Sequence, residues 1–330
     1  MTDVVVLGQI GRDLVLWVDG LPDAGGSVRA TERRELLGGK GANQAVALAQ
    51  LGVPVALVGV VGDDGPGAQA RAQAVADGID VSGVVTRPGT ATALLLDLVG
   101  NGGTRRLVEH VPAGVLLTGD DVAAADDLVA GCQVLSLQLQ QPGEAVRAAL
   151  DRAPAEAVVV TDGAPGDAGT RAAVLARTEV LRADAVEATR WVGRDLRGVD
   201  DAREAAAELL TAGPRLVSLA AGEAGDVVAW RAGPGLGTAA GMLEVDPRWA
   251  DGDTVVPLLG GPPVDPTGAG DAAVAALAAT LLGGAGPEDA AWAAAAAAAL
   301  TVAHAGGRPE LSPAAVGETV HRYRSARASG

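Results

Sequence analysis

A glycine-rich turn with an aspartate at each end, DPTGAGD, occupies residues 265–271 and leads into an apolar segment with no helix breaker before Gly283. A turn of this kind that opens a helix directs several backbone N–H groups and the positive end of the helix dipole at one point, which suits an anion. Asp271 lies at the same point, where a second negative charge is unfavourable unless it takes part in the chemistry. The role that fits is to accept a proton from a group that attacks the bound anion, so the segment predicts phosphoryl transfer to a hydroxyl. Taken alone, it also fits an ordinary capped helix.

A second glycine-rich turn, GGKGANQ, covers residues 38–44 and also precedes a helical pattern. No Ser or Thr follows Lys40, which excludes a Walker A loop, and Gln44 stands where a dinucleotide fingerprint has its third glycine. The glycines allow the backbone to approach a ligand closely. Lys40 suits a phosphate or a substrate oxygen, and Asn43 offers a donor and an acceptor to sugar hydroxyls. The alternative is a helix-starting turn with an exposed lysine.

The composition limits the classes of partner. The chain has 330 residues, a net charge of −16 and a pI near 4.5, so its bulk field disfavours nucleic acid. It has no Phe and one Tyr, which leaves few platforms for base stacking. The longest apolar stretch, around Trp292, is mostly alanine and predicts a packed soluble helix rather than a membrane span. A single cysteine, Cys132, and an N-terminus without a signal-peptide pattern indicate a cytoplasmic protein.

The elements that position the two turns can be predicted from the hydrophobic pattern. Short apolar runs alternate with helical segments from about residue 120 onward, which predicts a parallel sheet with helices on both faces. Two strand-rich segments, about 12–36 and 91–115, do not fit the alternation, and we expect them to form a small lid inserted in one domain spanning residues 1–330. The strands expected in the alternating part are 134–137, 157–161, 180–182, 216–219 and 227–230.

Together, the two turns resemble the two signature segments of the ribokinase-like carbohydrate kinases, the PfkB family. The first, LLGGKGANQAVALAQLG at 36–52, is nearly identical to the ribokinase version, and VDPTGAGDAAVAALAATLL at 264–282 is the second. The resemblance covers nearly the whole chain and includes the opening segment at 8–28, the Gly-Asp turn and "GID" helix exit at 61–84, and HAGGRPELSP at 304–313. It implies a three-layer α/β/α fold with a mostly parallel central sheet and a small β lid. It also implies ATP-dependent phosphorylation of a small sugar hydroxyl.

The resemblance assigns roles at the reacting centre. It implies that Asp271 is the general base and that the backbone N–H groups of Gly268, Ala269 and Gly270 form an anion hole for the γ-phosphoryl group. An ordinary Asp has a pKa of about 4, so Asp271 is expected to be ionised at neutral pH with little tuning. The residues implied to hold the sugar are Asp13, Gly39, Lys40, Asn43 and Gln140, together with Asp271.

The resemblance also implies sites for ATP, Mg²⁺ and K⁺. The nucleotide is expected to contact Asp184, Glu187, Ser218, Gly222 and Gly270. Magnesium is expected to arrive with ATP, with Glu187 acting on it indirectly. The residues implied to hold potassium are Asp265, the carbonyl of Thr267 and the loop around Gly306.

Three residues depart from the ribokinase pattern. Gly11 stands where ribokinase has an asparagine, which removes one hydrogen bond to the sugar. Gln140 replaces a glutamate, so it can still form a hydrogen bond but only as a neutral group. Asp184 replaces the asparagine of an Asn-x-x-Glu element, and its extra negative charge suits a hydrated magnesium ion but repels phosphate.

Several functions fit this set of residues. The first is a kinase of a free pentose or hexose. The second is a nucleoside (adenosine-type) kinase of the same fold, for which Leu14, Leu16 and Trp17 of the lid could cover a base. The third is a non-catalytic sugar-binding homologue, which would not need a base beside an anion hole. A sugar phosphate would require extra cations from the lid arginines Arg29, Arg33, Arg34, Arg105 and Arg106. The expected partners are therefore a sugar and ATP, and the lid edges could pair in a homodimer.

Overall fold

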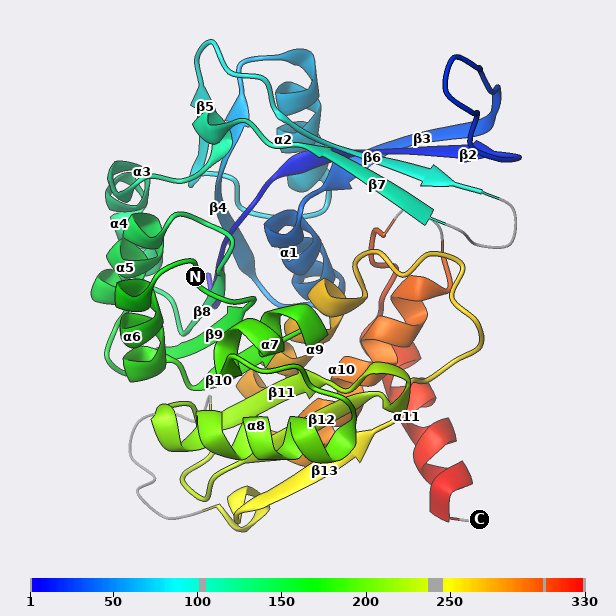
Figure 1. Ribbon diagram of the computed structural model, residues 1–330. Coiled ribbons are helices and arrows are strands. Elements are labelled where there is room, and N and C mark those ends of the chain that lie inside the picture. Colours follow the sequence, from blue (N-terminus) through cyan, green and yellow to red (C-terminus); the bar gives the residue numbers. More distant parts are fainter. Residues whose placement is uncertain (1, 101–104, 237–245, 305–306, 329–330) are drawn as a thin grey trace.

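The computed structural model describes residues 2–100, 105–236, 246–304 and 307–328 (Figure 1). Within these ranges one large sheet contains β1 (Val4–Leu7), β4 (Val55–Gly62), β5 (Val84–Arg87), β8 (Val134–Gln138), β9 (Val158–Asp162), β10 (Val180–Ala183), β11 (Leu216–Ala220), β12 (Asp226–Trp230) and β13 (Gly252–Val256). The strand order is β13–β12–β11–β10–β9–β8–β1–β4–β5. The neighbouring strands in the part β11–β10–β9–β8–β1–β4–β5 of this order are all parallel to one another.

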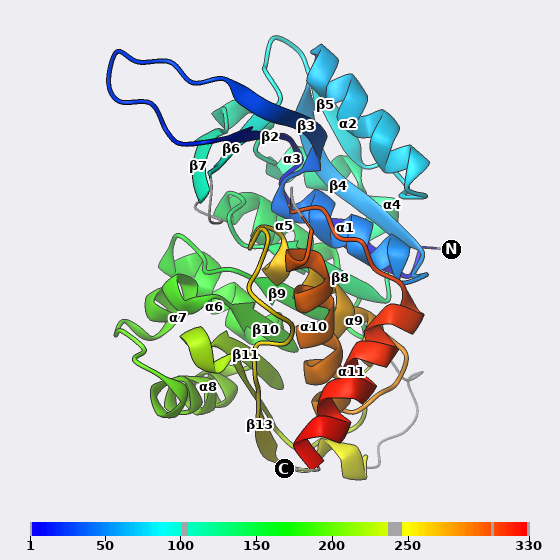
Figure 2. The same cartoon turned by 90° about the vertical axis from the view of Figure 1, so that its right-hand side faces the viewer.

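Helices cover both faces of the large sheet (Figures 1 and 2). One face packs against α1 (Lys40–Gln50), α2 (Gly65–Ala76), α9 (Ala269–Leu282), α10 (Pro287–Val302) and α11 (Pro313–Ala328). The other packs against α3 (Gly119–Ala124), α4 (Asp126–Val129), α5 (Gly143–Arg152), α6 (Ala168–Arg177), α7 (Ala185–Val192) and α8 (Val199–Ala212). Alternate residues of β1 serve the two cores, because successive strand side chains point to opposite faces. The predicted three-layer architecture is confirmed.

The helix pair α9 and α10 is rich in alanine and buried over most of its length. Small side chains let the two helix backbones approach closely, and Trp292 fills the space that alanine leaves on α10. In the part of the chain that the structure describes, we find no helix with the length and apolar composition needed to cross a bilayer.

One end of the large sheet differs from the predicted alternation. Strand β12 pairs antiparallel with β11, and β13 pairs antiparallel with β12. A short 3₁₀ turn, Gly222–Ala224, and Gly225 connect β11 to β12, with φ angles of 65° at Gly222 and 100° at Gly225. Such a connection is too short to contain the crossover helix that a parallel pair needs. The expectation of another parallel strand at 227–230 is therefore wrong.

A second sheet stands apart from the layers and consists of β2 (Gly11–Val18), β3 (Ala30–Gly38), β6 (Ala93–Val99) and β7 (Arg105–His110), in the order β3–β2–β6–β7. All four strands come from the two segments expected to form the lid. Strand β2 follows β1 after three residues, and β3 runs directly into the turn that opens α1. This four-stranded sheet is called the lid below (Figure 1). Its strand β2 contains the predicted sugar-binding residue Asp13, and its strand β3 leads into the glycine-rich turn before α1.

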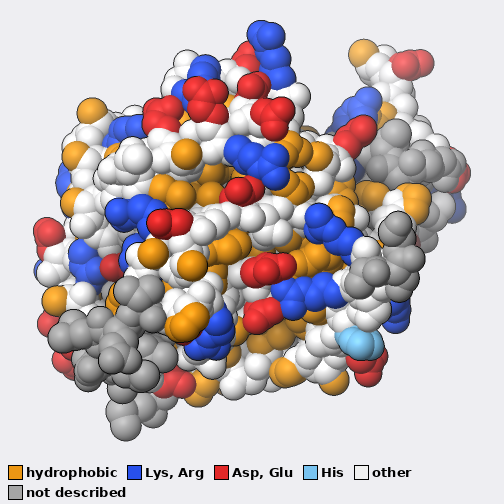
Figure 3. Space-filling model, turned by 90° about the horizontal axis from the view of Figure 1, so that it is seen from below, with side chains coloured by type: hydrophobic (Ala, Val, Ile, Leu, Met, Phe, Trp, Pro, Cys, Tyr) orange, Lys and Arg blue, Asp and Glu red, His pale blue; other side chains and the backbone are white. Residues whose placement is uncertain are grey.

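The surface mixes charges of both signs. On the face seen in Figure 3, acidic and basic side chains lie next to one another with hydrophobic side chains between them. Within the described residues this face carries no continuous basic surface.

Candidate active site

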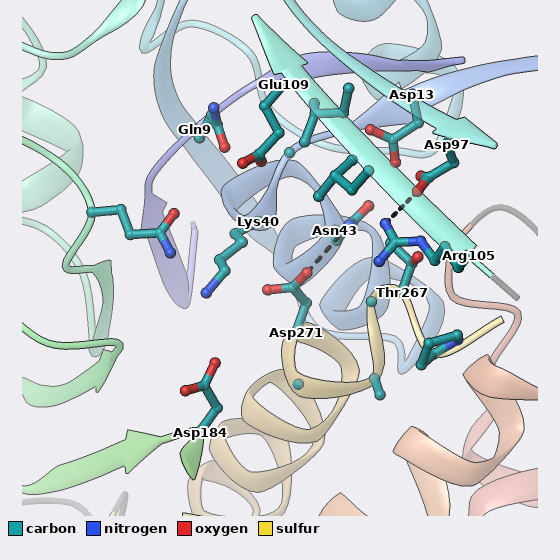
Figure 4. Close-up of a pocket in the computed structure, with 18 of the residues that line it drawn as sticks. Gln9, Asp13, Lys40, Asn43, Asp97, Arg105, Glu109, Asp184, Thr267 and Asp271 are labelled. Carbon is teal, nitrogen blue, oxygen red and sulfur yellow. Dashed lines mark hydrogen bonds and ion pairs between the residues drawn. The ribbon is translucent and has the colours of Figure 1, made fainter. Parts of the chain in front are cut away.

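A cavity of about 520 Å³ lies between the lid, the carboxyl ends of β1, β8 and β10, and the first turns of α1 and α9 (Figure 4). Ligands of open α/β sheets usually bind at this end of the strands. The fold brings both glycine-rich turns to the cavity, although they lie more than 200 residues apart. The predicted site residues that line it are Asp13, Gly39, Lys40, Asn43, Gln140, Asp184, Thr267, Gly268, Ala269, Gly270 and Asp271.

The first turn of α9 forms one wall of the cavity. Gly268 caps the helix with a φ of 73°, and a Cβ atom there would lie 1.9 Å from the carbonyl oxygen of Gly307. A Cβ at Gly270 would lie 2.6 Å from Nη1 of Arg182. The first intrahelical hydrogen bond runs from the N–H of Ala272 to the carbonyl of Gly268 (2.9 Å), so the N–H groups before it have no intrahelical acceptor. The glycines therefore leave a bare helix N-terminus facing the cavity.

Asp271 lies on this turn and is buried. Its Oδ2 accepts a hydrogen bond from Nδ2 of Asn43 (3.2 Å), and its Oδ1 accepts one from Nε2 of Gln44 (3.5 Å). Burial, followed by the negative charge of Asp162, raises the pKa of Asp271 to about 7, against the smaller opposing effects of Lys40 and Asn43. The expectation of an ordinary pKa near 4 is thus wrong. A carboxylate with a pKa near 7 is well matched to proton transfer at neutral pH.

Lys40 enters the cavity from the start of α1 and points between Asp271 and Asp184 (Figure 4). Its Nζ lies 3.0 Å from Oε1 of Glu187. Burial lowers the pKa of Lys40, but the carboxylates of Asp162, Glu187 and Asp271 outweigh this effect and raise it. Lys40 is therefore a fixed positive charge in a site rich in carboxylates.

Asp184 and Glu187 cap helix α7 reciprocally. The Asp184 side chain accepts a hydrogen bond from the N–H of Glu187 (2.8 Å), and the Glu187 side chain accepts one from the N–H of Asp184 (2.9 Å). Both carboxylate oxygens of Glu187 are thereby engaged, one by this cap and one by Lys40. Asp184 lines the cavity, whereas Glu187 is buried behind Lys40.

The lid contributes Asp13 to the cavity, as predicted, together with Arg105, one of the lid arginines considered for a sugar phosphate, and two acidic residues that the sequence did not single out, Asp97 and Glu109. Arg105 Nη2 lies 2.5 Å from Oδ1 of Asp97 (Figure 4). Burial, and then the charges of Asp97 and Asp271, raise the pKa of Asp13 to about 8. The one available signal for Asp97 was its position as the single polar residue in the apolar strand ALLLDLV.

The remaining predicted residues lie outside this cavity or beside it. Ser218 is buried on β11, and Gly222 lies in the turn after that strand, so neither lines the cavity. Asp265 is buried, and its Oδ1 accepts hydrogen bonds from the N–H (2.9 Å) and the hydroxyl (2.5 Å) of Thr267. Arg105 Nε lies 3.7 Å from the same oxygen. Gly306 is outside the described residues.

A second, mostly apolar cavity of about 240 Å³ lies beside the first. Pro266 and Ala269 line both cavities, so they meet at the start of α9. The walls of the second cavity come from the segment after β13, including Pro257 and Leu259, and from the end of α10, including Ala299. No sequence motif marks this cavity, because it is lined mostly by ordinary apolar residues from distant segments.

The family model and the curated relatives that match this chain are those of carbohydrate kinases. A family model described as "pfkB family carbohydrate kinase" matches residues 1–314. The ribokinase of Schizosaccharomyces pombe is 33% identical over 156 residues, which are 46% of this chain and 49% of that protein, so this match spans about half the relative's length. The ribokinase of Mus musculus is 28% identical over 276 residues, which cover 83% of this chain and 80% of that protein.

Among solved structures, Arabidopsis thaliana ribokinase complexed with ribose and ATP superimposes with a TM-score of 0.74. The superposition covers 97% of this chain and 99% of that one, at 22% sequence identity. At this level of identity the similarity establishes a common fold.

Proposed function

The chain belongs to the pfkB family of carbohydrate kinases, and from this premise we propose that it transfers the γ-phosphoryl group of ATP to a hydroxyl of a small, unphosphorylated sugar. The observation that carries the proposal is the position of Asp271. Its carboxylate is buried in the cavity, has a raised pKa, and belongs to the same helical turn as the N–H groups that can bind an anion. A protein that only binds sugar has no use for this combination.

The proposed reaction proceeds by direct transfer. Asp271 takes the proton of the sugar hydroxyl as the sugar oxygen forms a bond to the γ-phosphorus, and the bond from phosphorus to the bridging oxygen breaks, so that ADP leaves with that oxygen. The N–H groups of Gly268, Ala269 and Gly270 stabilise the charge on the phosphoryl oxygens. Removing one donor of such a site typically costs ~10²–10³ in rate.

Asp13, Gly39, Asn43 and Gln140 surround the space in front of Asp271, and we assign them to the sugar. Asp13 belongs to the lid, so closure of the lid over a sugar would bring its carboxyl group onto the hydroxyls. Lys40 stays beside Asp271 and Glu187, where its charge favours the incoming phosphoryl group.

The second cavity offers a place for the base of ATP, because it is apolar and adjoins the first turn of α9. A nucleotide that placed its base there would carry its phosphates past Pro266 and Ala269 toward the proposed anion hole. Ser218 and Gly222 lie outside both linings, and this assignment gives them no direct contact with the base.

Oxygen atoms at and beside the cavity suit the two cations of the proposal, Mg²⁺ and K⁺. Magnesium neutralises charge on the phosphates when it is bound, and its preferred ligands are oxygens. Asp184 is the acidic side chain on the nucleotide side of the cavity and would hold the ion through water, while Glu187 would act only by supporting Asp184 and Lys40. Asp265 and the carbonyl of Thr267 are the corresponding oxygen ligands for potassium. If they hold it, activity rises when K⁺ replaces Na⁺, and indifference to the cation would count against this site.

Charge on the lid argues against a phosphorylated acceptor. Of the five arginines proposed as phosphate partners, Arg105 lines the cavity, and it already contacts the carboxylates of Asp97 and Asp265. The nucleoside alternative also loses support, because Leu14, Leu16 and Trp17 do not line the cavity. Trp17 instead packs against the guanidinium of Arg34, 5.3 Å from the ring centre.

A coupled assay of ADP release tests the proposal, with ribose, deoxyribose, fructose, 2-keto-3-deoxygluconate, adenosine and fructose 1-phosphate as acceptors. We expect turnover of at least one free sugar and little or none of fructose 1-phosphate. A clear preference for adenosine would establish the nucleoside alternative. Sugar binding without turnover of any acceptor would establish a non-catalytic homologue.

A further inference from the structure

A buried polar cluster lies directly behind Asp271 and consists of Gln44, Ser136, Asp162 and Arg182. The first three side chains are at most 1% exposed. They come from α1, β8 and β9, and Arg182 comes from β10, so four separate elements meet at this point. Gln44, Ser136 and Asp162 do not line the cavity, so their contact with the reaction runs through Asp271.

The amide of Gln44 joins two carboxylates. Its Nε2 donates to Oδ2 of Asp162 (3.2 Å) and to Oδ1 of Asp271 (3.5 Å). Its Oε1 accepts a hydrogen bond from the hydroxyl of Ser136 (3.0 Å). This fixes which way the amide points, because ionised carboxylates can only accept and the serine hydroxyl can donate. With Asn43 on the other oxygen, both oxygens of Asp271 are held by amides of adjacent residues on α1.

Charged side chains from α1, β9, β10 and the lid surround Asp271. Asp162 on β9 is the negative neighbour with the largest effect, and it forms an ion pair with Arg182 (3.0 Å). Lys40 on α1 and Arg182 on β10 act in the opposite direction, and Asp13 faces Asp271 from the lid. Arg182 also lies against Gly270, so the ion pair reaches the turn that carries the base.

We propose that Gln44 and Asp162 are positioning residues for Asp271: Gln44 fixes the orientation of its carboxylate, and the negative charge of Asp162 makes it a stronger base. This inference rests on the proposed function, in which Asp271 accepts the sugar proton. Without Asp162, burial would still raise the pKa of Asp271, but the opposing charges of Lys40 and Arg182 would offset more of that increase and leave a more acidic, weaker base. Asp162 itself neither gains nor loses a proton in the reaction.

Asp162→Asn tests the electrostatic part, since it keeps the shape of the side chain and removes its charge. We expect the acid limb of the kcat/KM profile to move down by about one pH unit, the order of shift that one nearby charge produces. The KM for sugar should change little while kcat at neutral pH falls.

Gln44→Glu adds a carboxylate instead and should move the acid limb of the kcat/KM profile upward. Asp121→Asn is the matched control, because Asp121 is also a buried aspartate paired with an arginine, Arg87 (2.6 Å), but is not among the groups that act on Asp271.

Absence of turnover by the wild-type protein would refute the proposed function, not this inference. In that case the pKa of Asp271 is measured directly by ¹³C NMR of labelled aspartate carboxyls, assigned with Asp271→Asn. An acid limb, or a directly measured pKa of Asp271, that is the same in folded Asp162→Asn and in the wild type overturns the inference. If Asp162→Asn does not fold, the upward shift expected for Gln44→Glu decides, and its absence has the same meaning.

Discussion

Asp271 is held in place from three directions: the α9 backbone fixes its Cα, the amides of Asn43 and Gln44 contact its two oxygens, and Lys40 lies nearby. If Asp271 is the proton acceptor, as we propose, its side chain is already held in position and does not have to reorganise when the sugar binds. Preset geometry of this kind is a major source of rate enhancement, and it depends on the charge as well as the shape of the side chain.

Asp271→Asn keeps the shape and removes the basicity. We expect kcat to fall by at least ~10³ while the sugar dissociation constant changes little, because the loss of general base catalysis is compounded by lost alignment. Steady-state kinetics and calorimetric sugar binding measure the two quantities. A variant that retained a tenth of wild-type activity would contradict the assignment of Asp271 as the base. Asp63→Asn, in an exposed turn, is the control for the substitution itself.

At the scale of elements, Asp184 caps helix α7 and also lines the cavity, so a change at this residue affects both the helix and the site. Asp184→Ala removes the cap and should lower the free energy of unfolding by about 1 kcal/mol, whereas Asp184→Asn keeps an acceptor for the N–H of Glu187 and should preserve it. If Asp184 holds magnesium, both variants need more Mg²⁺ for half-maximal activity. Thermal unfolding and magnesium titration at fixed ATP separate the two roles. An unchanged magnesium requirement in both variants would leave Asp184 with the cap alone.

The register of the lid strands brings acidic side chains together at the cavity. Leu95 on β6 pairs with Asp13 on β2 and with Glu109 on β7, so two carboxyl groups flank one leucine across the sheet. All three line the cavity, with Asp97 two residues beyond Leu95. In the proposed function, we expect this surface to accept hydrogen bonds from sugar hydroxyls and to disfavour a phosphate group.

Removing a negative charge from the lid should therefore weaken discrimination against sugar phosphates. We expect Glu109→Gln to raise kcat/KM for fructose 1-phosphate relative to fructose by about fivefold, since one like-charge contact at a solvated site costs about 1 kcal/mol. Asp97→Asn should act in the same direction and also free Arg105. Glu32→Gln, on the exposed strand β3, is the control. An unchanged ratio in both lid variants would show that the lid does not select by charge.

The sequence predicts those parts of the site in which a local turn sets the geometry. DPTGAGD and GGKGANQ each combine glycines with a helix start, so their residues could be assigned without knowing the fold. Gln44, although it is the last residue of GGKGANQ, was given no role, and neither were Asp162, Arg182 and Asp97, because each acquires its role only from contacts with other elements. The raised pKa of Asp271 could not be predicted from the sequence either, because its two largest causes, burial and the charge of Asp162, both arise from the tertiary structure.

At the scale of the whole molecule, the fold places several carboxyl groups where burial opposes their ionisation. The pKa values of Asp13 and Asp271 are raised from 3.8 to about 8 and about 7, with burial as the largest cause for both. Burial also raises the pKa values of Asp97, Glu179 and Asp226. These buried acids therefore weaken the fold when they lose their protons.

The unfavourable free energy of ionising these buried acids predicts how the stability of the fold depends on pH. The unfolded chain releases these protons near pH 4, whereas the folded chain keeps those of Asp13 and Asp271 until about pH 7 to 8, so unfolding releases protons in between and rising pH favours it. Carboxylates with lowered pKa values, such as Asp121 and Asp64, titrate below this window. We expect the ligand-free protein to lose about 1–3 kcal/mol of stability between pH 6 and pH 8.5.

Asp13→Asn tests the origin of this dependence, because the amide cannot ionise and Asp13 has the larger shift of the two. The variant should gain stability relative to the wild type at pH 8.5, should differ less from it at pH 6, and should show a flatter profile between them. Urea unfolding at a series of pH values measures the profile, and Asp121→Asn should alter stability without altering the slope, since the pKa of Asp121 is lowered. Wild-type stability that is flat or rising between pH 6 and 8.5 would contradict the prediction. An unchanged slope in Asp13→Asn would assign the effect to other acids, with Asp271→Asn as the next variant to examine, because Asp271 is the other acid whose pKa is raised to near neutrality.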